Sequence, residues 1–346
     1  MSREIDWENL GFTYMPTNGY VGSVFRGGSW SPPSVRRDEE LKLHVAASCL
    51  HYGQSCFEGL KAFGRKDGTV AFFRPAENAR RLAQSARRLE MEPPPEGLFL
   101  ETISAAVKLN SDFVPPYGTG ASLYIRPLLI GTTARIGLKP ASEYELIVLA
   151  VPVGPYYKNG FFPVKAFVQE AFDRAAPRGV GNVKAAGNYA AGLTGDLDAK
   201  RKGYPIALYL DSARHRFVDE FGTSNFFGIT SEGSYVTPDS HSVLPSITND
   251  SLQQMAGDMG FPVEKRPVEV SELSRFAEVG ACGTAAVITP ICSITHGETV
   301  YRFGREDRAG ETLSRLYNRI REIQYGEIDD SRGWMVSVED AAGRAG

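Results

Sequence analysis

One lysine of the chain lies in a stretch of small residues. Residues 179–193 read GVGNVKAAGNYAAGL, and Lys184 is the only charged residue among them. Glycine and alanine let a planar group come close to the backbone, and burial disfavours the ammonium form of a lysine. Because a neutral amine attacks aldehydes, this lysine could form a Schiff base. Taken alone, the stretch is more typical of a solvated lysine in a turn before a helix.

Three polar segments that follow the lysine could complete a site with it. Residues 219–225 place Glu220 in an otherwise apolar hairpin, residues 246–248 begin a helix whose amides can hold a phosphate, and residues 283–285 offer a hydroxyl and further amides. Each has an ordinary interpretation, as a surface charge, a helix cap and a tight turn. Together with Lys184 and a helix arginine, they are the groups that pyridoxal 5′-phosphate needs. The amine binds the aldehyde, the carboxylate keeps the pyridine nitrogen protonated, and the arginine and amides neutralise the phosphate.

The domains that must position these groups follow from length and hydrophobic periodicity. The length of 346 residues favours two domains, and the alternation of helical and strand periods predicts an α/β fold with mixed sheets. We place a small N-terminal α/β domain at residues 1–153, an interdomain loop at 154–163, and a large C-terminal cofactor-binding domain at 164–346.

The individual elements follow from the same patterns. The expected helices cover residues 74–91, 98–109, 188–201, 246–256, 271–278 and 311–324, and the expected strands cover 41–45, 69–73, 122–130, 144–153, 163–169 and 206–210. Two strand–turn–strand units are expected at 216–229 and 278–290, and a hairpin turn at Asp67 and Gly68. Pro127 implies an edge or a bulge in its strand, because proline cannot donate to a sheet ladder. The tail after Tyr325 is expected to be loosely ordered.

Composition and missing motifs set several function classes aside. The net charge of −3 gives no basic field for nucleic acid, and no run of about 20 apolar residues predicts a membrane span. No glycine-rich nucleotide loop or Gly-x-Ser-x-Gly elbow is present, and the five histidines have no metal-ligand spacing, so we expect no metal. The N-terminus is polar, unlike a secretory signal. The scattered cysteines indicate reduced thiols in a cytoplasmic protein, at Cys49, Cys56, Cys282 and Cys292.

Six segments, taken in order, resemble one known family. They are HYGQSCFEGLKAF at 51–63, LYIRPL at 123–128, KAAGNY at 184–189, EFGTSN at 220–225, VLPSIT at 243–248 and CGTAA at 282–286. On these segments, and over residues 7–325 as a whole, the chain resembles the branched-chain-amino-acid aminotransferases, which are pyridoxal-phosphate enzymes of fold type IV. The resemblance implies their two-domain fold, like that of D-amino-acid aminotransferase, and pyridoxal 5′-phosphate as the cofactor.

The same resemblance implies roles for individual residues. Lys184 would form the internal aldimine and later move a proton between the substrate Cα and the cofactor C4′. Arg81, preferred by register to its neighbour Arg80, would hold the phosphate. The implied cofactor contacts are Arg81, Lys184, Tyr189, Glu220, Thr223, Ile247, Thr248 and Thr284. The implied substrate contacts are Tyr52, Phe57, Tyr124, Arg126, Tyr156, Thr284 and Ala285, with Ile136 and Leu138 reaching into the pocket of a partner subunit.

The implied reaction moves an amino group from L-leucine, L-isoleucine or L-valine to 2-oxoglutarate and gives the branched 2-oxo acid and L-glutamate. Arg126 lies two residues after Tyr124 on one strand, so both share a sheet face, and Arg126 is expected to meet the glutamate carboxylate. The apolar, glycine-containing segment 132–141 predicts a homodimer with paired active sites. Mammalian members carry a redox Cys-x-x-Cys after Gly-Thr-Ala. Residues 285–289 read AAVIT here, so no thiol switch is expected at that place.

Three other functions stay open on the sequence. A D-amino-acid aminotransferase and an aminodeoxychorismate lyase share the fold and the lysine, but the Tyr-x-Arg strand and the His-Tyr-Gly run match the branched-chain group. The third is a non-catalytic ligand-binding protein on the same fold. The presence of Lys184, Glu220 and Arg81 together argues against it.

Overall fold

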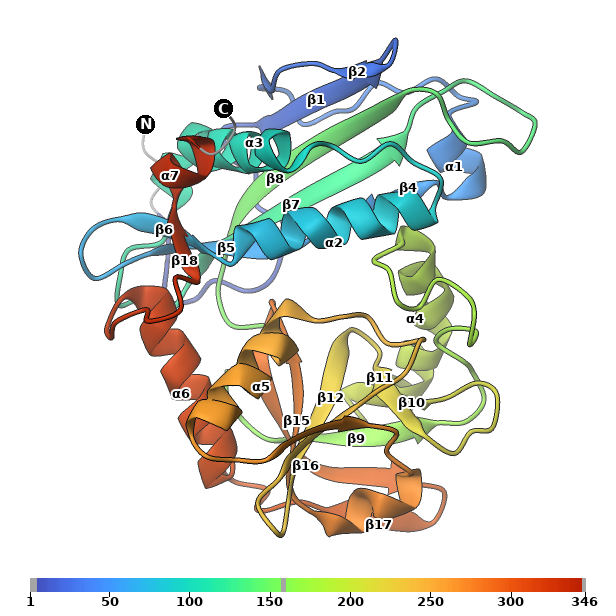
Figure 1. Cartoon of the computed structure of the whole chain (residues 1–346), viewed down its shortest axis with the longest axis vertical. Coiled ribbons are helices and arrows are strands. Elements are labelled where there is room, and N and C mark those ends of the chain that lie inside the picture. The colour runs from blue at the N-terminus through green and yellow to red at the C-terminus, as the bar shows by residue number, and fades with distance from the viewer. Residues whose placement is uncertain (1–4, 157–159, 344–346) are drawn as a thin grey trace. The chain divides into compact units, whose positions relative to one another are not determined.

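The chain forms two compact units. The structure, a computed structural model, describes residues 5–156 and 160–343 (Figure 1). The first unit comprises Met1–Lys158, Lys184–Ala186 and Glu322–Gly346, and the second comprises Asn159–Val183 and Gly187–Arg321. The change of unit after residue 158 falls inside the expected interdomain loop, 154–163, at positions outside the described residues. The C-terminal segment differs from the expectation, because it belongs to the first unit and not to the second.

The first unit is an antiparallel sheet with helices packed against it. Its elements are β1 (Tyr20–Arg26), β2 (Ser29–Trp30), β3 (Ser34–Arg36), α1 (Ser48–Tyr52), β4 (Ser55–Phe57), β5 (Leu60–Gly64), β6 (Val70–Phe73), α2 (Pro75–Arg88), α3 (Glu96–Leu109), η1 (Ser111–Phe113), β7 (Ser122–Gly131), β8 (Tyr144–Val153), β18 (Met335–Ser337) and α7 (Val338–Gly343). Within the described residues the strand order is β18-β6-β5-β7-β8-β1-β2, with β3 paired to β1 and β4 paired to β7. Figure 1 shows α2 and α3 running alongside this sheet.

Helix α2 shows how the sequence pattern builds the first unit. Pro75 occupies its first turn, where a missing N–H costs nothing. Its buried residues recur every three or four positions, as on one face of a helix, at Asn78, Ala79, Leu82, Ser85 and Ala86. The apolar members of this face join a core with residues of α3 and the sheet, including Phe72, Phe99 and Leu123. The polar members of the same face become important at the site.

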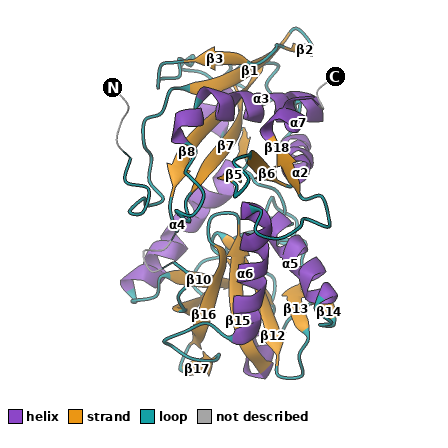
Figure 2. Cartoon of the chain, turned by 90° about the vertical axis from the view of Figure 1, so that its left-hand side faces the viewer, coloured by secondary structure: helices purple, strands orange, loops and turns teal. Residues whose placement is uncertain are grey.

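The second unit is a mixed sheet that closes on itself. Its elements are β9 (Val164–Gln169), α4 (Ala186–Arg201), β10 (Ile206–Leu210), β11 (Val218–Phe221), β12 (Ser224–Thr230), β13 (Tyr235–Pro238), α5 (Ile247–Asp258), β14 (Val263–Arg266), η2 (Val270–Arg275), β15 (Phe276–Gly283), β16 (Val287–His296), β17 (Thr299–Arg302) and α6 (Glu311–Tyr325). The strand order is β11-β10-β9-β16-β15-β12-β13-β14, and β11 also pairs with β12, which closes the ring. Helix α5 contacts β15, and the amides at the start of α6 donate to Glu278 of the same strand (Figure 2).

Most expected elements are present near their predicted bounds, but the segments 41–45 and 271–278 differ. Residues 41–45 form no strand, because alternation alone does not supply a neighbouring strand to pair with. Residues 270–275 form the 3₁₀-helix η2, started by a capping box of Glu269 and Glu272, and the chain enters β15 already at Phe276. Periodicity over so few residues does not distinguish a helix from the start of a strand.

Two further expectations, for Pro127 and for the tail after Tyr325, are wrong because these segments pair with strands that are distant in the sequence. Pro127 is at neither an edge nor a bulge, because β7 pairs with β8 in continuous register and has β5 and β4 on its other side. Pro127 falls in the gap between those two partners. The tail after Tyr325 is ordered in its described part, since β18 pairs with β6 and α7 follows it. Among the described residues, no helix is both long and apolar enough to cross a membrane.

Candidate active site

The main chain of Lys184 is held on both sides within the first unit. Its amide donates to Ser85 Oγ of α2 at 3.0 Å, and its carbonyl accepts from the Phe57 amide of β4 at 3.1 Å. Ala185 forms a β-bridge with Cys56. The lysine segment therefore pairs with β4 over a few residues. This pairing explains why Lys184–Ala186 belongs to the first unit, while the residues on either side of it belong to the second.

Two cationic groups lie against the ring of Phe57. Lys184 Nζ is 4.7 Å from the ring centroid, and the guanidinium carbon of Arg126 is also 4.7 Å from it, within the range of cation–π attraction. Arg126 donates from Nε and Nη2 to Tyr124 Oη, at 3.2 and 3.0 Å. Burial raises the pKa of Tyr124, and the Arg126 charge only partly opposes this. The prediction that Tyr124 and Arg126 share a face is confirmed.

Arg81 and Arg80 have very different surroundings. Arg81 forms a bidentate pair with the fully buried Glu58, with Nε–Oε1 at 2.7 Å and Nη2–Oε2 at 2.8 Å. Asn78 Nδ2 also donates to Glu58 Oε2, at 2.7 Å. The Arg80 side chain is 60% exposed and pairs with Glu77 at 2.6 Å. Arg81 is therefore the arginine that points into the first unit.

An aromatic cluster surrounds Tyr124. Phe12 lies edge-on to Tyr124 with ring centroids 5.0 Å apart, and edge-on to Tyr156 at 5.3 Å. A side chain on Gly59 would collide with the Tyr124 hydroxyl, so glycine at this position is what lets that hydroxyl approach the backbone. The Tyr52 hydroxyl donates to the carbonyl of Ile136.

Two apolar residues of the segment 132–141 are among the most exposed large side chains of the chain. Ile136 is 74% and Leu138 is 79% exposed. Isolated apolar residues at a surface are common, but here two of them lie close together in one glycine-containing loop. Water contact at both positions is what a loop that inserts into another subunit would show before assembly.

In the second unit, the Glu220 carboxylate is held by groups from several segments. Arg174 lies 2.9 Å from Glu220 Oε1, the amide of Leu244 donates to the same oxygen at 3.3 Å, and Asn225 Nδ2 donates to Oε2 at 2.9 Å. Glu220 and Asn225 are directly paired across β11 and β12. The carboxylate in the apolar hairpin is therefore a buried, paired group and not a surface charge.

The start of α5 has the donors that an anion needs. Ser246 caps the helix, because its Oγ accepts from the Asn249 amide at 3.1 Å. The amides of Ile247 and Thr248 occupy the first two helical positions, which have no acceptor within the helix. Thr248 is buried. Amides of this kind, at the positive end of the helix dipole, hold phosphates.

The turn between β15 and β16 contains Thr284 and Ala285, both half-buried. The turn ends at Val287, whose φ of 66° lies in the left-handed region. That is an outlier for a β-branched residue, and such strain is concentrated at functional sites. A side chain on Gly283 would meet only Ser224 Cβ, at 3.9 Å, so the start of the turn is open.

Two predicted cofactor contacts lie at the ends of elements in the second unit. Thr223 is exposed in the turn between β11 and β12, and Tyr189 is half-buried in the first turn of α4. Thr223 follows the strand that carries Glu220, and Tyr189 follows Lys184 by five residues in the sequence. The contacts of both residues with a cofactor stay a prediction.

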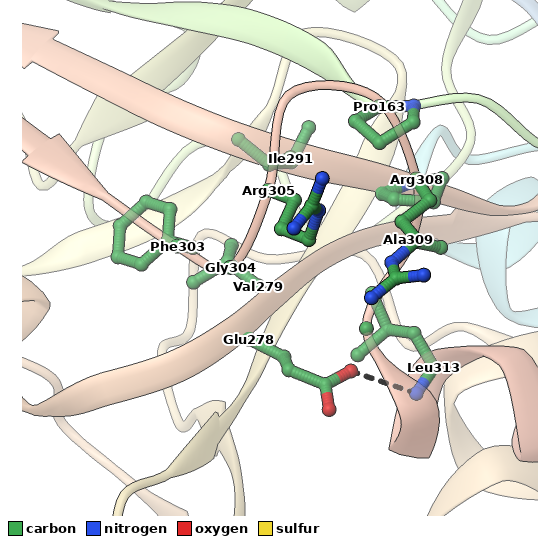
Figure 3. A pocket seen from close by; sticks show the side chains of 12 residues that line it. Pro163, Glu278, Val279, Ile291, Phe303, Gly304, Arg305, Arg308, Ala309 and Leu313 are labelled. Carbon is green, nitrogen blue, oxygen red and sulfur yellow. Dashed lines mark hydrogen bonds between the residues drawn. The ribbon is translucent and has the colours of Figure 1, made fainter.

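A separate hollow of the second unit lies beside β15, β16 and the start of α6 (Figure 3). None of its lining residues is a predicted site residue. Glu278 accepts from the amides of Thr312 and Leu313, at 3.0 and 2.9 Å, and so already occupies the start of α6. Arg305 is paired with Asp307. The hollow is therefore not part of the candidate site.

Comparison with known proteins gives the family. The sequence profile of amino-transferase class IV matches residues 55–294. A branched-chain-amino-acid aminotransferase of Helicobacter pylori is 44% identical over 336 residues, which cover 96% of this chain and 98% of that protein. One of Haemophilus influenzae is 43% identical and covers 97% of this chain and 100% of that protein. The chain belongs to the branched-chain-amino-acid aminotransferase family, within the class IV aminotransferases.

The fold agrees with this family. A solved branched-chain amino acid aminotransferase from T.th., complexed with N-(5′-phosphopyridoxyl)-L-glutamate, superposes with a TM-score of 0.76 at 26% identity, and covers 93% of this chain and 99% of that chain. The mixed α/β architecture is therefore the fold type IV architecture expected from the sequence.

Several residues of this aminotransferase that the sequence did not single out hold the predicted ones in place. Glu58 pairs with Arg81, Ser85 anchors Lys184, Arg174 pairs with Glu220, and Phe12 bridges two predicted pocket tyrosines. The sequence could have indicated a role for Glu58, because a carboxylate within the aromatic, glycine-rich run 50–63 is costly to bury unless it is paired with a cation. The others contact residues distant in the sequence, so spacing could not reveal them.

Proposed function

We propose that this aminotransferase transfers the amino group of L-leucine, L-isoleucine or L-valine to 2-oxoglutarate with pyridoxal 5′-phosphate. The observation that carries the proposal is Lys184, whose main chain is fixed by Ser85 and Phe57 and whose Nζ lies 4.7 Å from an aromatic ring centroid. The relatives from Helicobacter pylori and Haemophilus influenzae support the substrate class, since their names state branched-chain amino acids. The solved T.th. enzyme supports the cofactor and glutamate together, because its ligand joins a phosphopyridoxyl group to L-glutamate.

The residues present fit this cofactor by the chemistry of their donors. The first unit supplies an amine, Lys184, and a buried guanidinium, Arg81. The second unit supplies a buried carboxylate, Glu220, which is paired with Arg174. It also supplies the two amides at the start of α5. We infer that these groups bind the aldehyde, the phosphate and the pyridine nitrogen, together with Tyr189, Thr223 and Thr284. The cofactor, when bound, supplies the electron sink that lets the Cα–H bond of an amino acid break.

Lys184 would bind the cofactor aldehyde and then accept and return the substrate Cα proton. A general base needs to be neutral near the working pH. Arg126 lies over the same ring of Phe57 as Lys184, so that two predicted site residues contact one aromatic surface.

The substrate pocket would combine an apolar wall with one polar edge. Phe57, Tyr156 and Phe12 present aromatic surface for an aliphatic side chain. Arg126 uses two of its five N–H donors on Tyr124, which leaves donors for the second carboxylate of glutamate. We infer that Tyr52 completes the wall and that the turn of Thr284 and Ala285 holds the substrate α-carboxylate.

The active form is proposed to be a homodimer. The exposure of Ile136 and Leu138 supports a loop that completes the pocket of a second copy. Light scattering at assay concentrations tests this, and an active monomer would contradict it. The four cysteines are free thiols, and the cytoplasmic location predicted from them stays a prediction.

The experiment that tests the proposed function is an amino-donor panel with 2-oxoglutarate as acceptor. L-Leucine, L-isoleucine and L-valine should be the best donors, and L-glutamate should form in equal amount to the branched 2-oxo acid. Turnover of D-alanine or D-leucine in place of the L-forms would favour a D-amino-acid aminotransferase. Release of pyruvate from aminodeoxychorismate would favour the lyase. Binding of the cofactor without turnover of any donor would favour a ligand-binding protein.

A further inference from the structure

One buried arginine joins three segments of the second unit. The Arg174 side chain is 9% exposed and lies in the segment after β9. Its Nη2 is 2.9 Å from Glu220 Oε1 on β11 and donates to the carbonyl of Gly181 at 3.3 Å. The same nitrogen donates to the carbonyl of Ser242. Gly181 lies three residues before Lys184, and Ser242 lies in the loop that leads to α5.

The two loops are packed closely at this arginine. A side chain on Gly181 would collide with the Ser242 carbonyl and would come within 2.8 Å of Arg174 Nη2. The loop before α5 also reaches Glu220 directly through the amide of Leu244. A single guanidinium group therefore contacts the Glu220 carboxylate, the loop that precedes Lys184 and the loop that precedes α5.

Arg174 lies among several negatively charged groups near Glu220. Asp219, its neighbour on β11, is also buried, and burial raises the pKa of Asp219 against the opposing Ser240 hydrogen bond and the Arg174 charge. Across the sheet, burial raises the pKa of the Cys282 thiol, and the charge of Glu220 adds to that rise. Asp173 and Asp211 add negative charge on the side of Asp219. Arg174 therefore pairs directly with Glu220, and its charge also opposes the raised pKa of Asp219.

We propose that Arg174 is a positioning residue that keeps Glu220 ionised and oriented, so that Glu220 can act as the charged partner of the cofactor ring nitrogen. This rests on the proposed function, because that task of Glu220 exists only with the cofactor. The role is expressed through Glu220, and the ties to Gly181 and Ser242 hold the guanidinium in place for it.

A double-mutant cycle tests this role. Apoproteins are prepared with Arg174→Met, Glu220→Gln and both changes, and pyridoxal 5′-phosphate is titrated into each while the visible absorption band and its pH dependence are recorded. Arg174→Met should weaken cofactor binding about tenfold to a hundredfold, the scale of a lost charged hydrogen bond, and should shift the pH profile of the band as Glu220→Gln does. In the Glu220→Gln background, Arg174→Met should change binding by no more than about twofold.

The matched control is Arg178→Met, an exposed arginine on the same segment, which should behave as the wild type. Failure of the wild-type apoprotein to bind the cofactor would refute the proposed function. Wild-type binding by both Arg174→Met and Arg178→Met would overturn only the role of Arg174. Equal losses from Arg174→Met in both backgrounds would also overturn it, since Arg174 would then act on the loops alone.

A second variant covers the case in which Arg174→Met does not give a folded apoprotein by circular dichroism. The same cycle is then run with Arg174→Lys, which keeps the charge. Its loss should be smaller than that of Glu220→Gln and should vanish in the Glu220→Gln background. A loss of the same size in both backgrounds would contradict the proposal.

Discussion

The two units hold their predicted catalytic groups in different ways. In the first unit the main chain of Lys184 is fixed, by Ser85 Oγ and by the Phe57 amide. In the second unit the side chain of Glu220 is fixed, by Arg174, Asn225 and the Leu244 amide. A main-chain anchor fixes the point from which the lysine side chain extends, whereas a side-chain anchor fixes the position of a charge. The difference matches the proposed tasks, since a proton-carrying amine has to reach more than one atom.

The largest effect should come from the buried ion pair of the first unit. Glu58→Ala leaves the Arg81 guanidinium buried without its carboxylate, and breaking such a pair costs about 3–5 kcal/mol of unfolding free energy. Urea unfolding measures it. The matched control on the same helix is Glu77→Ala, whose pair with Arg80 is exposed and is worth at most about 1 kcal/mol. Similar losses for both variants would mean that the pair of Glu58 and Arg81 is no more important than a surface pair.

The next effect concerns the polar edge of the substrate pocket. Arg126→Met should lower kcat/KM of the glutamate and 2-oxoglutarate half-reactions by about 1.5–3 kcal/mol, the scale of a charged hydrogen bond, and should affect the leucine half-reaction much less. Stopped-flow measurement of each half-reaction separates the two. Equal losses in both half-reactions would show that Arg126 serves the structure or the shared α-carboxylate.

The smallest effect is expected where Ser85 holds the main chain of Lys184. Ser85→Ala removes the acceptor of the Lys184 amide and should cost about 1–2 kcal/mol, because it leaves a donor unpaired. It should also slow the recovery of the visible absorption band when the cofactor is added back to apoprotein. Ser104→Ala is the control. Ser104 is buried on α3 with an Oγ that has no partner among the described residues, so its removal should leave both measurements unchanged. If Ser85→Ala matched Ser104→Ala, the main-chain anchor would be unimportant.

The sequence predicted the elements and the reactive residues better than their supports. The strand 144–153 and the helix of residues 75–88 were predicted because their own apolar residues follow the spacing of a strand and of a helix. β18 was missed because it is a strand only by pairing with β6, far earlier in the chain. Arg174 was missed for a related reason. Nothing in its local sequence distinguishes it from the exposed Arg178, and only the fold places one beside Glu220.

Covalent trapping shows whether Lys184 is the residue that bonds the cofactor. The cofactor-loaded protein is reduced with borohydride and digested, and the phosphopyridoxyl group is located by mass spectrometry. The group is expected on Lys184, and Lys184→Ala is expected to show no label, no visible band and almost no turnover. A label on another lysine, such as the buried Lys61, or wild-type turnover by Lys184→Ala would contradict the account.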